Sequence, residues 1–214
     1  MNISISRLAR LALASFFLVG SSAAIGADIA EGKQSPLLKP AQPTNVDAGK
    51  VEVVEVIWYA CGHCYLIEPS VEAWIKKGKP ANVEVIRLPA TWNNTLKLHA
   101  RAFYTVEVLG RPELHTELFR EMNVRGNRLD TKAKLEDFST SHGVSKQDFE
   151  KTYAGFAVTT RVDRAEQLNK NYRITSTPTF IVNGKYKTDV GAAGSEEKLF
   201  EVINALAERE TPAG

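Results

Sequence analysis

Cysteine is scarce in this sequence, because its 214 residues contain only Cys61 and Cys64. A disulfide between such close neighbours closes a very small loop and removes little chain entropy, so it would be a poor structural staple. A disulfide-rich scaffold is therefore excluded. A hydrophobic content of 43% allows a chain of this length to build a core without staples and argues against wholesale disorder.

The sequence also lacks an apolar run long enough to span a membrane. Its most apolar stretch, residues 11–20, is shorter than the roughly 20 residues that a spanning helix needs. Basic residues precede this stretch and the small residues of 21–27 follow it, so we predict a cleaved secretory signal peptide over residues 1–27. The candidate cleavage positions follow Ala24, Gly26 and Ala27. No cysteine follows the apolar stretch, which excludes a lipid-modified N-terminus.

A charge imbalance is missing as well. Removal of Arg7 and Arg10 with the predicted signal reduces the 27 basic residues to 25, against 25 acidic residues. The mature chain is formally neutral, and nothing in it indicates nucleic-acid binding. An exported chain is expected in a compartment where thiols can oxidise.

The first third of the chain predicts a strand, a loop, a helix and a second strand. Residues 51–59 are β-branched and aromatic, and a helical pattern then runs to Gly78 and Pro80. Residues 83–90 repeat the strand pattern. Such a βαβ unit is expected to be right-handed and parallel.

The middle of the chain, from about residue 96 to 172, is helical throughout and predicts about five helices. Residues 177–188 then predict a hairpin around Asn183-Gly184, and Ser195 is a plausible N-cap of a closing helix. This order indicates an α/β fold, a thioredoxin arrangement with an inserted helical subdomain. The predicted divisions are the arm 28–50, the thioredoxin-like segments 51–92 and 173–214, and the helical insertion 93–172.

Three kinds of chemistry use a C-x-x-C pair. A zinc site needs four ligands, and no histidine lies at ligand spacing from these two cysteines. Covalent haem attachment needs a histidine where this chain has Tyr65. Redox chemistry fits better, because Cys61 lies at a helix N-terminus, where free N–H groups and the helix dipole stabilise a thiolate.

The surrounding residues agree with redox chemistry. His63 can add positive charge or a hydrogen bond to the Cys61 sulfur. The alternative is that it is only an exposed loop histidine without a role in the chemistry. Gly62 is expected to let a tight turn close without strain. Pro69 lies within a helical pattern, where a proline destabilises the helix, so other contacts must hold the helix together at this point. Thr177-Pro178 precedes a strand, and sequence alone does not decide whether that bond is cis.

The combined pattern resembles a known family. Cys-Gly-x-Cys with a proline five residues after the second cysteine, and Thr-Pro before a hairpin, is similar to the thioredoxin superfamily. The dipeptide within CGHC matches that of protein disulfide isomerases. The signal peptide, the helical insertion and the phrases CGHCY, HARAFYTVEVLG and TPTFIVNGKY resemble the DsbA family of periplasmic thiol:disulfide oxidoreductases, over residues 51–208.

This resemblance implies roles for individual residues. Cys61 would be the exposed nucleophile and Cys64 its buried partner. Pro178 would be cis beside the disulfide, and the backbone of Thr177 would bind an incoming peptide in β fashion. Glu55, six residues before Cys61, would be a buried acid that relays a proton to or from Cys64.

Other interpretations of the surrounding residues remain open. Glu55 could instead be an ordinary edge-facing acid like Glu52, and Arg87 is a candidate charge partner for it. Trp58 and Trp92 either border a substrate groove or pack normally. We interpret His99 as a capped or surface histidine.

The implied function is donation of the Cys61–Cys64 disulfide to newly exported proteins in the periplasm, through a mixed disulfide at Cys61. A DsbB-like, quinone-linked membrane protein would reoxidise the pair, with no other cofactor or metal, and the protein is expected to be a monomer. The most oxidising members carry Pro-His between the cysteines, so Gly-His predicts a milder oxidant. The alternatives are an isomerase or reductase of the same superfamily and a peptide-binding chaperone with incidental cysteines.

Overall fold

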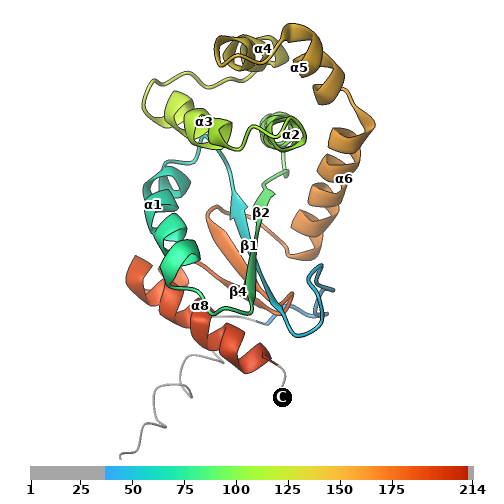
Figure 1. Cartoon of the computed structure of the whole chain (residues 1–214). Helices are drawn as coiled ribbons and strands as arrows, with labels where there is room; N and C mark the ends of the chain where they lie inside the picture. Colours follow the sequence, from blue (N-terminus) through green and yellow to red (C-terminus); the bar gives the residue numbers. More distant parts are fainter. Residues whose placement is uncertain (1–36, 212–214) are drawn as a thin grey trace, which may run out of the picture.

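The structure is a computed structural model that describes residues 37–211. Figure 1 shows a central sheet with helices on both sides and a group of helices beyond one end of it. The sheet has four strands in the order β2-β1-β3-β4. They are β1 (Val51–Ile57), β2 (Val83–Pro89), β3 (Thr179–Val182) and β4 (Tyr186–Thr188). The predicted signal peptide lies outside the described residues.

The predicted βαβ unit is confirmed. β1 and β2 are parallel, with Val51 opposite Val83 and Ile57 opposite Pro89. They are joined by α1 (Gly62–Lys77), which ends at Gly78 as the sequence indicated. The carboxyl ends of both strands therefore lie at the same end of the sheet as the start of α1, which is where Cys61 lies (Figure 1).

The predicted hairpin is also confirmed. β3 is antiparallel to β1 and to β4. Its turn has Asn183 at φ 49° and Gly184 at φ 64°, the positive values that a two-residue turn of this hand requires. A Cβ on Gly184 would lie 2.1 Å from the Gln42 carbonyl oxygen, so glycine also allows the N-terminal segment to pass close to the turn.

Five helices lie between β2 and β3, as expected. They are α2 (Asn94–Val108), α3 (Glu113–Asn123), α4 (Lys132–Ser141), α5 (Lys146–Tyr153) and α6 (Phe156–Asn171). The closing helix α8 (Glu196–Glu210) begins after Ser195, whose side chain caps it as predicted. The sequence did not predict α7 (Val190–Ala193), because one turn is too short to show helical periodicity.

The sheet separates two hydrophobic cores. Alternate β1 side chains point to opposite faces, so Val51 and Val53 pack with α1 and α8, whereas Val54 and Val56 pack with the inserted helices. The second core continues from the sheet into the helices without a break, through residues such as Phe103 and Leu118. The end of the sheet that carries Cys61 is thus packed directly against the helices α2–α6, which we call the helical block.

Within the described part of the arm, residues 37–50, Leu37 forms an isolated bridge with Tyr186. One expectation needs revision. Glu52 is not edge-facing, because β1 is a central strand and this side chain is only 1% exposed. Its carboxylate accepts a hydrogen bond from the Asn45 backbone N–H at 2.8 Å. No helix within residues 37–211 is long and apolar enough to cross a membrane.

Candidate active site

Cys61 is the N-cap residue of α1. Its backbone is extended, and its Sγ accepts a hydrogen bond from the Cys64 N–H at 3.4 Å. The Cys61 N–H in turn donates to the Trp58 carbonyl oxygen at 3.0 Å, which closes the turn between β1 and the helix. The sulfur therefore lies where the first free N–H groups of a helix point, as the sequence predicted.

This position makes the Cys61 thiol acidic. The pKa of Cys61 is lowered to about 5, chiefly by a hydrogen bond from the Cys64 thiol and also by Thr177 and the backbone N–H groups of Cys64 and His63, against the opposing effect of burial. Cys64 is only 1% exposed. Its hydrogen bond to Cys61 and its burial raise the pKa of Cys64 above that of an ordinary thiol. Both thiols are free in this structure, so it describes the reduced pair, in which Cys61 is the sulfur that ionises.

A loop distant in sequence completes the site. The bond between Thr177 and Pro178 is cis, and the carbonyl oxygen of Thr177 lies 3.4 Å from the Cys61 Sγ. A hollow of about 430 Å³ opens beside this loop. Its lining includes His63, Leu66 and Ile67 from α1, the loop 176–178, and Asp189, Val190, Gly191 and Glu196.

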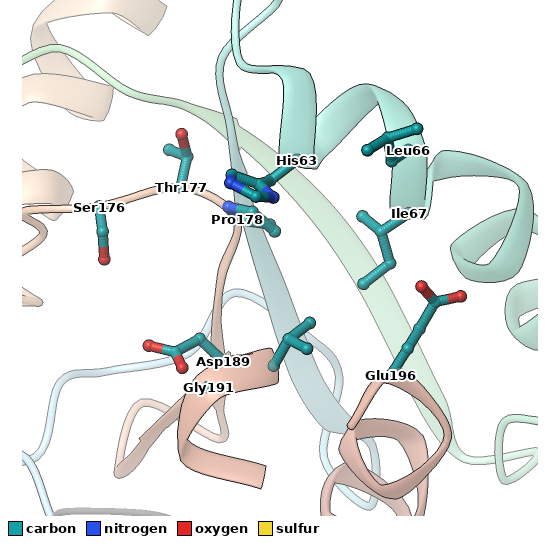
Figure 2. A pocket seen from close by; sticks show the side chains of 10 residues that line it. His63, Leu66, Ile67, Ser176, Thr177, Pro178, Asp189, Gly191 and Glu196 are labelled. Carbon is teal, nitrogen blue, oxygen red and sulfur yellow. The ribbon is translucent and has the colours of Figure 1, made fainter. Parts of the chain in front are cut away.

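Figure 2 shows how this groove is arranged. The His63 ring lies over Pro178, with Leu66 and Ile67 along one side and Asp189 and Glu196 toward the far end. His63 and Leu66 are exposed, with Leu66 exposed to 70%. The wall next to the cysteines is thus apolar and open, and the far end carries two carboxylates.

The structure changes the expected contributions of two residues between the cysteines. His63 acts on Cys61 through its backbone N–H, because the imidazole turns toward the groove (Figure 2). Gly62 was expected to allow a tight turn, but it is the first residue of α1, and its φ lies outside the left-handed region. A Cβ at this position would meet nothing within 4 Å, so the backbone here does not need glycine.

Glu55 is fully buried in a cluster of charges below α1. Its Oε2 accepts from the Arg87 Nε at 3.1 Å. The same guanidinium binds Glu68 at 2.8 Å and Glu72 at 2.9 Å, both on α1. Burial raises the pKa of Glu55 to about 7, against the lowering effect of Arg87. One arginine thus faces three carboxylates, and Glu55 Oε1 has no hydrogen-bond partner.

The sequence missed three residues that contact the segment before Cys61. His99 is not a surface histidine: it is 2% exposed and accepts a hydrogen bond from the Trp58 indole Nε1 at 2.8 Å. His115 binds the Tyr59 hydroxyl, and the Asn123 side chain donates to the Tyr59 carbonyl oxygen at 2.6 Å. The only sequence signal for the histidines was their place within amphipathic helical patterns.

The two tryptophans that were candidates for the groove border lie elsewhere. Trp58 packs against the core of the helical block, and its ring stacks on that of His99 at 6.2 Å between centroids. Trp92 is 45% exposed and lines a separate hollow of about 210 Å³, next to Lys97 and Arg173. Within residues 37–211, no group of three or more His, Cys, Asp or Glu side chains could hold a metal ion.

Comparison with known proteins gives consistent matches. The family described as DSBA-like thioredoxin domain matches residues 81–201. The thiol:disulfide interchange protein DsbA of Pseudomonas syringae pv. tomato is 39% identical, over 94% of each chain. That of Azotobacter vinelandii is 38% identical, over 95% of each chain. The solved structure of Pseudomonas aeruginosa DsbA has a TM-score of 0.78 at 36% identity, covering 84% of this chain and 93% of that one.

Proposed function

The chain belongs to the DsbA family of thiol:disulfide interchange proteins, and from this premise we propose that Cys61 and Cys64 form the disulfide that it donates to newly exported proteins. The protein is a protein-disulfide oxidoreductase. The observation that best supports these residues is their asymmetry. The pKa of Cys61 is lowered to about 5 at a helix N-cap, while that of buried Cys64 is raised.

The reaction has two exchanges. A substrate thiolate attacks the Cys61 Sγ of the oxidised pair, the Cys61–Cys64 bond breaks, and Cys64 leaves and takes up a proton. A second substrate thiolate then attacks the substrate sulfur of this mixed disulfide, and Cys61 leaves as a thiolate. The substrate loses two electrons and gains a disulfide, and the protein gains the same two electrons as a reduced pair.

The driving force is the stability of the Cys61 thiolate. Stabilising the thiolate stabilises the reduced protein and therefore favours transfer of the disulfide to the substrate. It also makes Cys61 the better leaving group in the second exchange. The helix N-terminus, the Cys64 thiol and Thr177 supply this stabilisation.

The groove beside the cis-proline loop is the proposed substrate site. The carbonyl oxygen of Thr177 lies 3.4 Å from the Cys61 Sγ, the sulfur that the substrate attacks, and the backbone there can pair with an extended peptide as an added strand would. The exposed apolar surface of Leu66 and Pro178 (Figure 2) can contact side chains next to the substrate cysteine. His63 lies at the mouth of this groove and is proposed to contact substrate as well as to support Cys61 through its backbone.

Glu55 is proposed to exchange a proton with Cys64 as that sulfur leaves or attacks. A pKa of about 7 allows the carboxyl group to release and accept a proton near neutral pH. Arg87 connects Glu55 to Glu68, which lies on the same helix as Cys64. Replacing Glu55 with Gln is expected to slow the steps that move a proton to or from Cys64 without raising the pKa of Cys61.

The setting of the reaction follows the family. DsbA homologues are periplasmic enzymes that exchange disulfides with exported proteins, and we propose export of this chain through a signal peptide over residues 1–27. A DsbB-like, quinone-linked membrane protein is the proposed reoxidant of a monomer that uses no cofactor beyond its cysteines. Residues 93–172 are proposed as a helical subdomain inserted between thioredoxin-like segments 51–92 and 173–214.

Trapping the mixed disulfide tests the assignment of the two cysteines. With a reduced, unfolded substrate that has a single cysteine, Cys64→Ser loaded on Cys61 with thionitrobenzoate, whose thiolate leaves readily, is expected to accumulate a covalent complex through Cys61. Cys61→Ser is expected to form none and to lose oxidase activity. Retention of full activity by Cys61→Ser would instead support a chaperone with incidental cysteines.

The reduction potential separates a disulfide donor from a reductase of the same superfamily. Equilibration of the protein with a series of glutathione buffers should place the pair well above thioredoxin, which is at about −270 mV, and below the strongest family oxidants, at about −120 mV. A potential near that of thioredoxin would identify a reductase and overturn the donor assignment.

A further inference from the structure

The two residues before the turn into the active site, Trp58 and Tyr59, are held by the helical block through three side chains. Trp58 donates to His99 of α2, the Tyr59 hydroxyl binds His115 of α3, and the Tyr59 carbonyl oxygen accepts from Asn123 at the end of α3. We propose that His99, His115 and Asn123 are positioning residues, which hold this segment so that the Cys61 sulfur stays at the N-terminus of α1. This proposal rests on the proposed role of Cys61.

The contact with His99 has a defined direction. An indole N–H can only donate, so the Nδ1 of His99 must accept from Trp58, and a neutral imidazole then carries its proton on Nε2. That nitrogen lies 3.3 Å from the Leu129 carbonyl oxygen, which can accept a hydrogen bond from the Nε2–H. Both ring nitrogens are therefore used, and burial, which lowers the pKa of His99, keeps the ring neutral.

The contacts of Tyr59 fix both its backbone and its ring. The ring is 2% exposed and packs edge-on against Phe119, with centroids 5.1 Å apart. Asn123 donates both to the Tyr59 carbonyl oxygen and to that of Phe119, at 2.6 and 2.8 Å. One amide thus ties the last turn of α3 to the segment between β1 and Cys61.

These contacts act on the sulfur through the backbone. The Cys61 N–H binds the Trp58 carbonyl oxygen, so the position of Trp58 determines where the N-cap residue lies. The Cys61 sulfur accepts from the Cys64 nitrogen at 3.4 Å, an ordinary length for a bond to sulfur. A displacement of the segment would change the distance and angle of this bond, and hydrogen bonds weaken as their alignment is lost.

The chain offers a matched control for Asn123. Asn169 of α6 makes the same pair of bonds, donating to the carbonyl oxygen four residues earlier and to that of Pro89, at 2.8 and 3.1 Å. It ties a helix of the same block to the end of β2, where Pro89 lies opposite Ile57, and it makes no bond to Trp58 or Tyr59. Asn123→Ala and Asn169→Ala therefore each remove two side-chain bonds to carbonyl oxygens, and only the first removes a bond made directly to the residues that precede Cys61.

The test is the thiolate absorbance of the two reduced variants, titrated against pH, together with their urea midpoints. Both variants are expected to unfold at lower urea than the unmutated protein. Only Asn123→Ala is expected to raise the pKa of Cys61, by about half a unit or more, a threefold change in acid dissociation, and to lower the reduction potential. An unchanged pKa in Asn123→Ala, or an equal rise in Asn169→Ala, would overturn the proposal.

A second pair keeps the proposal testable if an asparagine variant does not fold. Tyr59→Phe removes only the hydroxyl that binds His115, and Tyr104→Phe removes the hydroxyl of another tyrosine in the same core. Tyr59→Phe should raise the pKa of Cys61 and Tyr104→Phe should not. His115→Asn, which keeps a polar atom near Nδ1, should stay closer to the unmutated pKa than His115→Leu. The opposite order, or no difference within either pair, would overturn the proposal.

The outcome can be separated from that for the proposed function. The pKa of Cys61 is measured without a substrate, so a raised value in Asn123→Ala supports positioning whether or not Cys61 donates a disulfide. The trapping experiment with Cys64→Ser tests the donor role alone. Failure of one result therefore does not decide the other.

Discussion

The buried carboxyl group of Glu55 predicts a specific dependence of folding stability on pH. This side chain is fully buried, and one of its oxygens has no hydrogen-bond partner. Desolvation raises its pKa from 4.5 to about 7 despite the neighbouring Arg87. A group whose pKa is raised on folding binds its proton more tightly in the folded protein than in the unfolded chain.

The sign and size of the effect follow from that difference. The stabilisation from the proton on Glu55 is complete below pH 4.5 and is lost as the pH rises through about 7. At about 1.4 kcal/mol per pKa unit, the interval from 4.5 to about 7 corresponds to about 3 kcal/mol. Glutamine cannot ionise, so Glu55→Gln should be free of this loss and should keep a hydrogen-bonding group beside Arg87.

The assay is urea unfolding of the oxidised protein across this pH range, because Cys61 does not titrate in a disulfide. The free energy of unfolding of Glu55→Gln, measured relative to the unmutated protein, should rise by about 3 kcal/mol between pH 4.5 and pH 8. Glu84→Gln is the control, since it removes a carboxylate that is 46% exposed on the same sheet, and the change for Glu55→Gln should exceed the change for this variant. Parallel curves for Glu55→Gln and the unmutated protein would show that folding does not raise the pKa of Glu55, and would refute the reasoning.

Three further outcomes are expected. Gly184→Ala should lower the free energy of unfolding by about 2 kcal/mol or more, because alanine would have to adopt a positive φ and its Cβ would lie 2.1 Å from the Gln42 carbonyl oxygen. An unchanged urea midpoint would contradict this turn geometry. Leu118 is 1% exposed in the core between the sheet and the helices, so Leu118→Ala should leave a cavity and lower the free energy of unfolding by about 3 kcal/mol. A loss below about 1 kcal/mol would show that neighbouring side chains fill the cavity. The pKa of Cys61 is lowered from 9 to about 5, so the stability of the reduced protein relative to the oxidised one should be greatest near pH 9 and should fall as the pH drops from there to about 5. The raised pKa of Cys64 should lower it again above pH 9. Paired urea melts at several pH values measure this, and a pH-independent difference would contradict an acidic Cys61.

The sequence predicted those features of the fold that depend on local pattern. The β-branched run of β1, the glycine that ends α1 and the Asn-Gly turn each bring their own conformational preference, so the elements could be placed in order. The helix α7 was not predicted because its four residues are too few to show helical periodicity. Glu52 was misjudged for a different reason, since an acid on a central strand is exposed or buried according to what packs over it. In this fold its partner is the backbone of Asn45, in the irregular arm that precedes β1.

The chemistry of the site divides in the same way. The C-x-x-C pair and the helix that follows it are contiguous, so the acidic cysteine at a helix N-terminus could be predicted from spacing alone. The imidazole of His63 was expected to act on the sulfur, but the backbone N–H groups do so, and these are a property of the helix itself and not of the side chain. No local pattern could assign His115, because its partner Tyr59 lies 56 residues away in the chain.

The acidity of Cys61 therefore depends on more of the chain than its own loop. The sulfur contacts Thr177, 116 residues away, and its N-cap position depends on Trp58, which is bonded to a histidine 41 residues away. Two proteins with the same CGHC sequence could thus differ in thiol pKa through changes in α2 or α3 alone. A change in the dipeptide between the cysteines and a change in the contacts of the helical block should therefore shift the reduction potential additively, as independent sites do. A non-additive shift is expected only where the dipeptide change also moves the Trp58–Tyr59 segment.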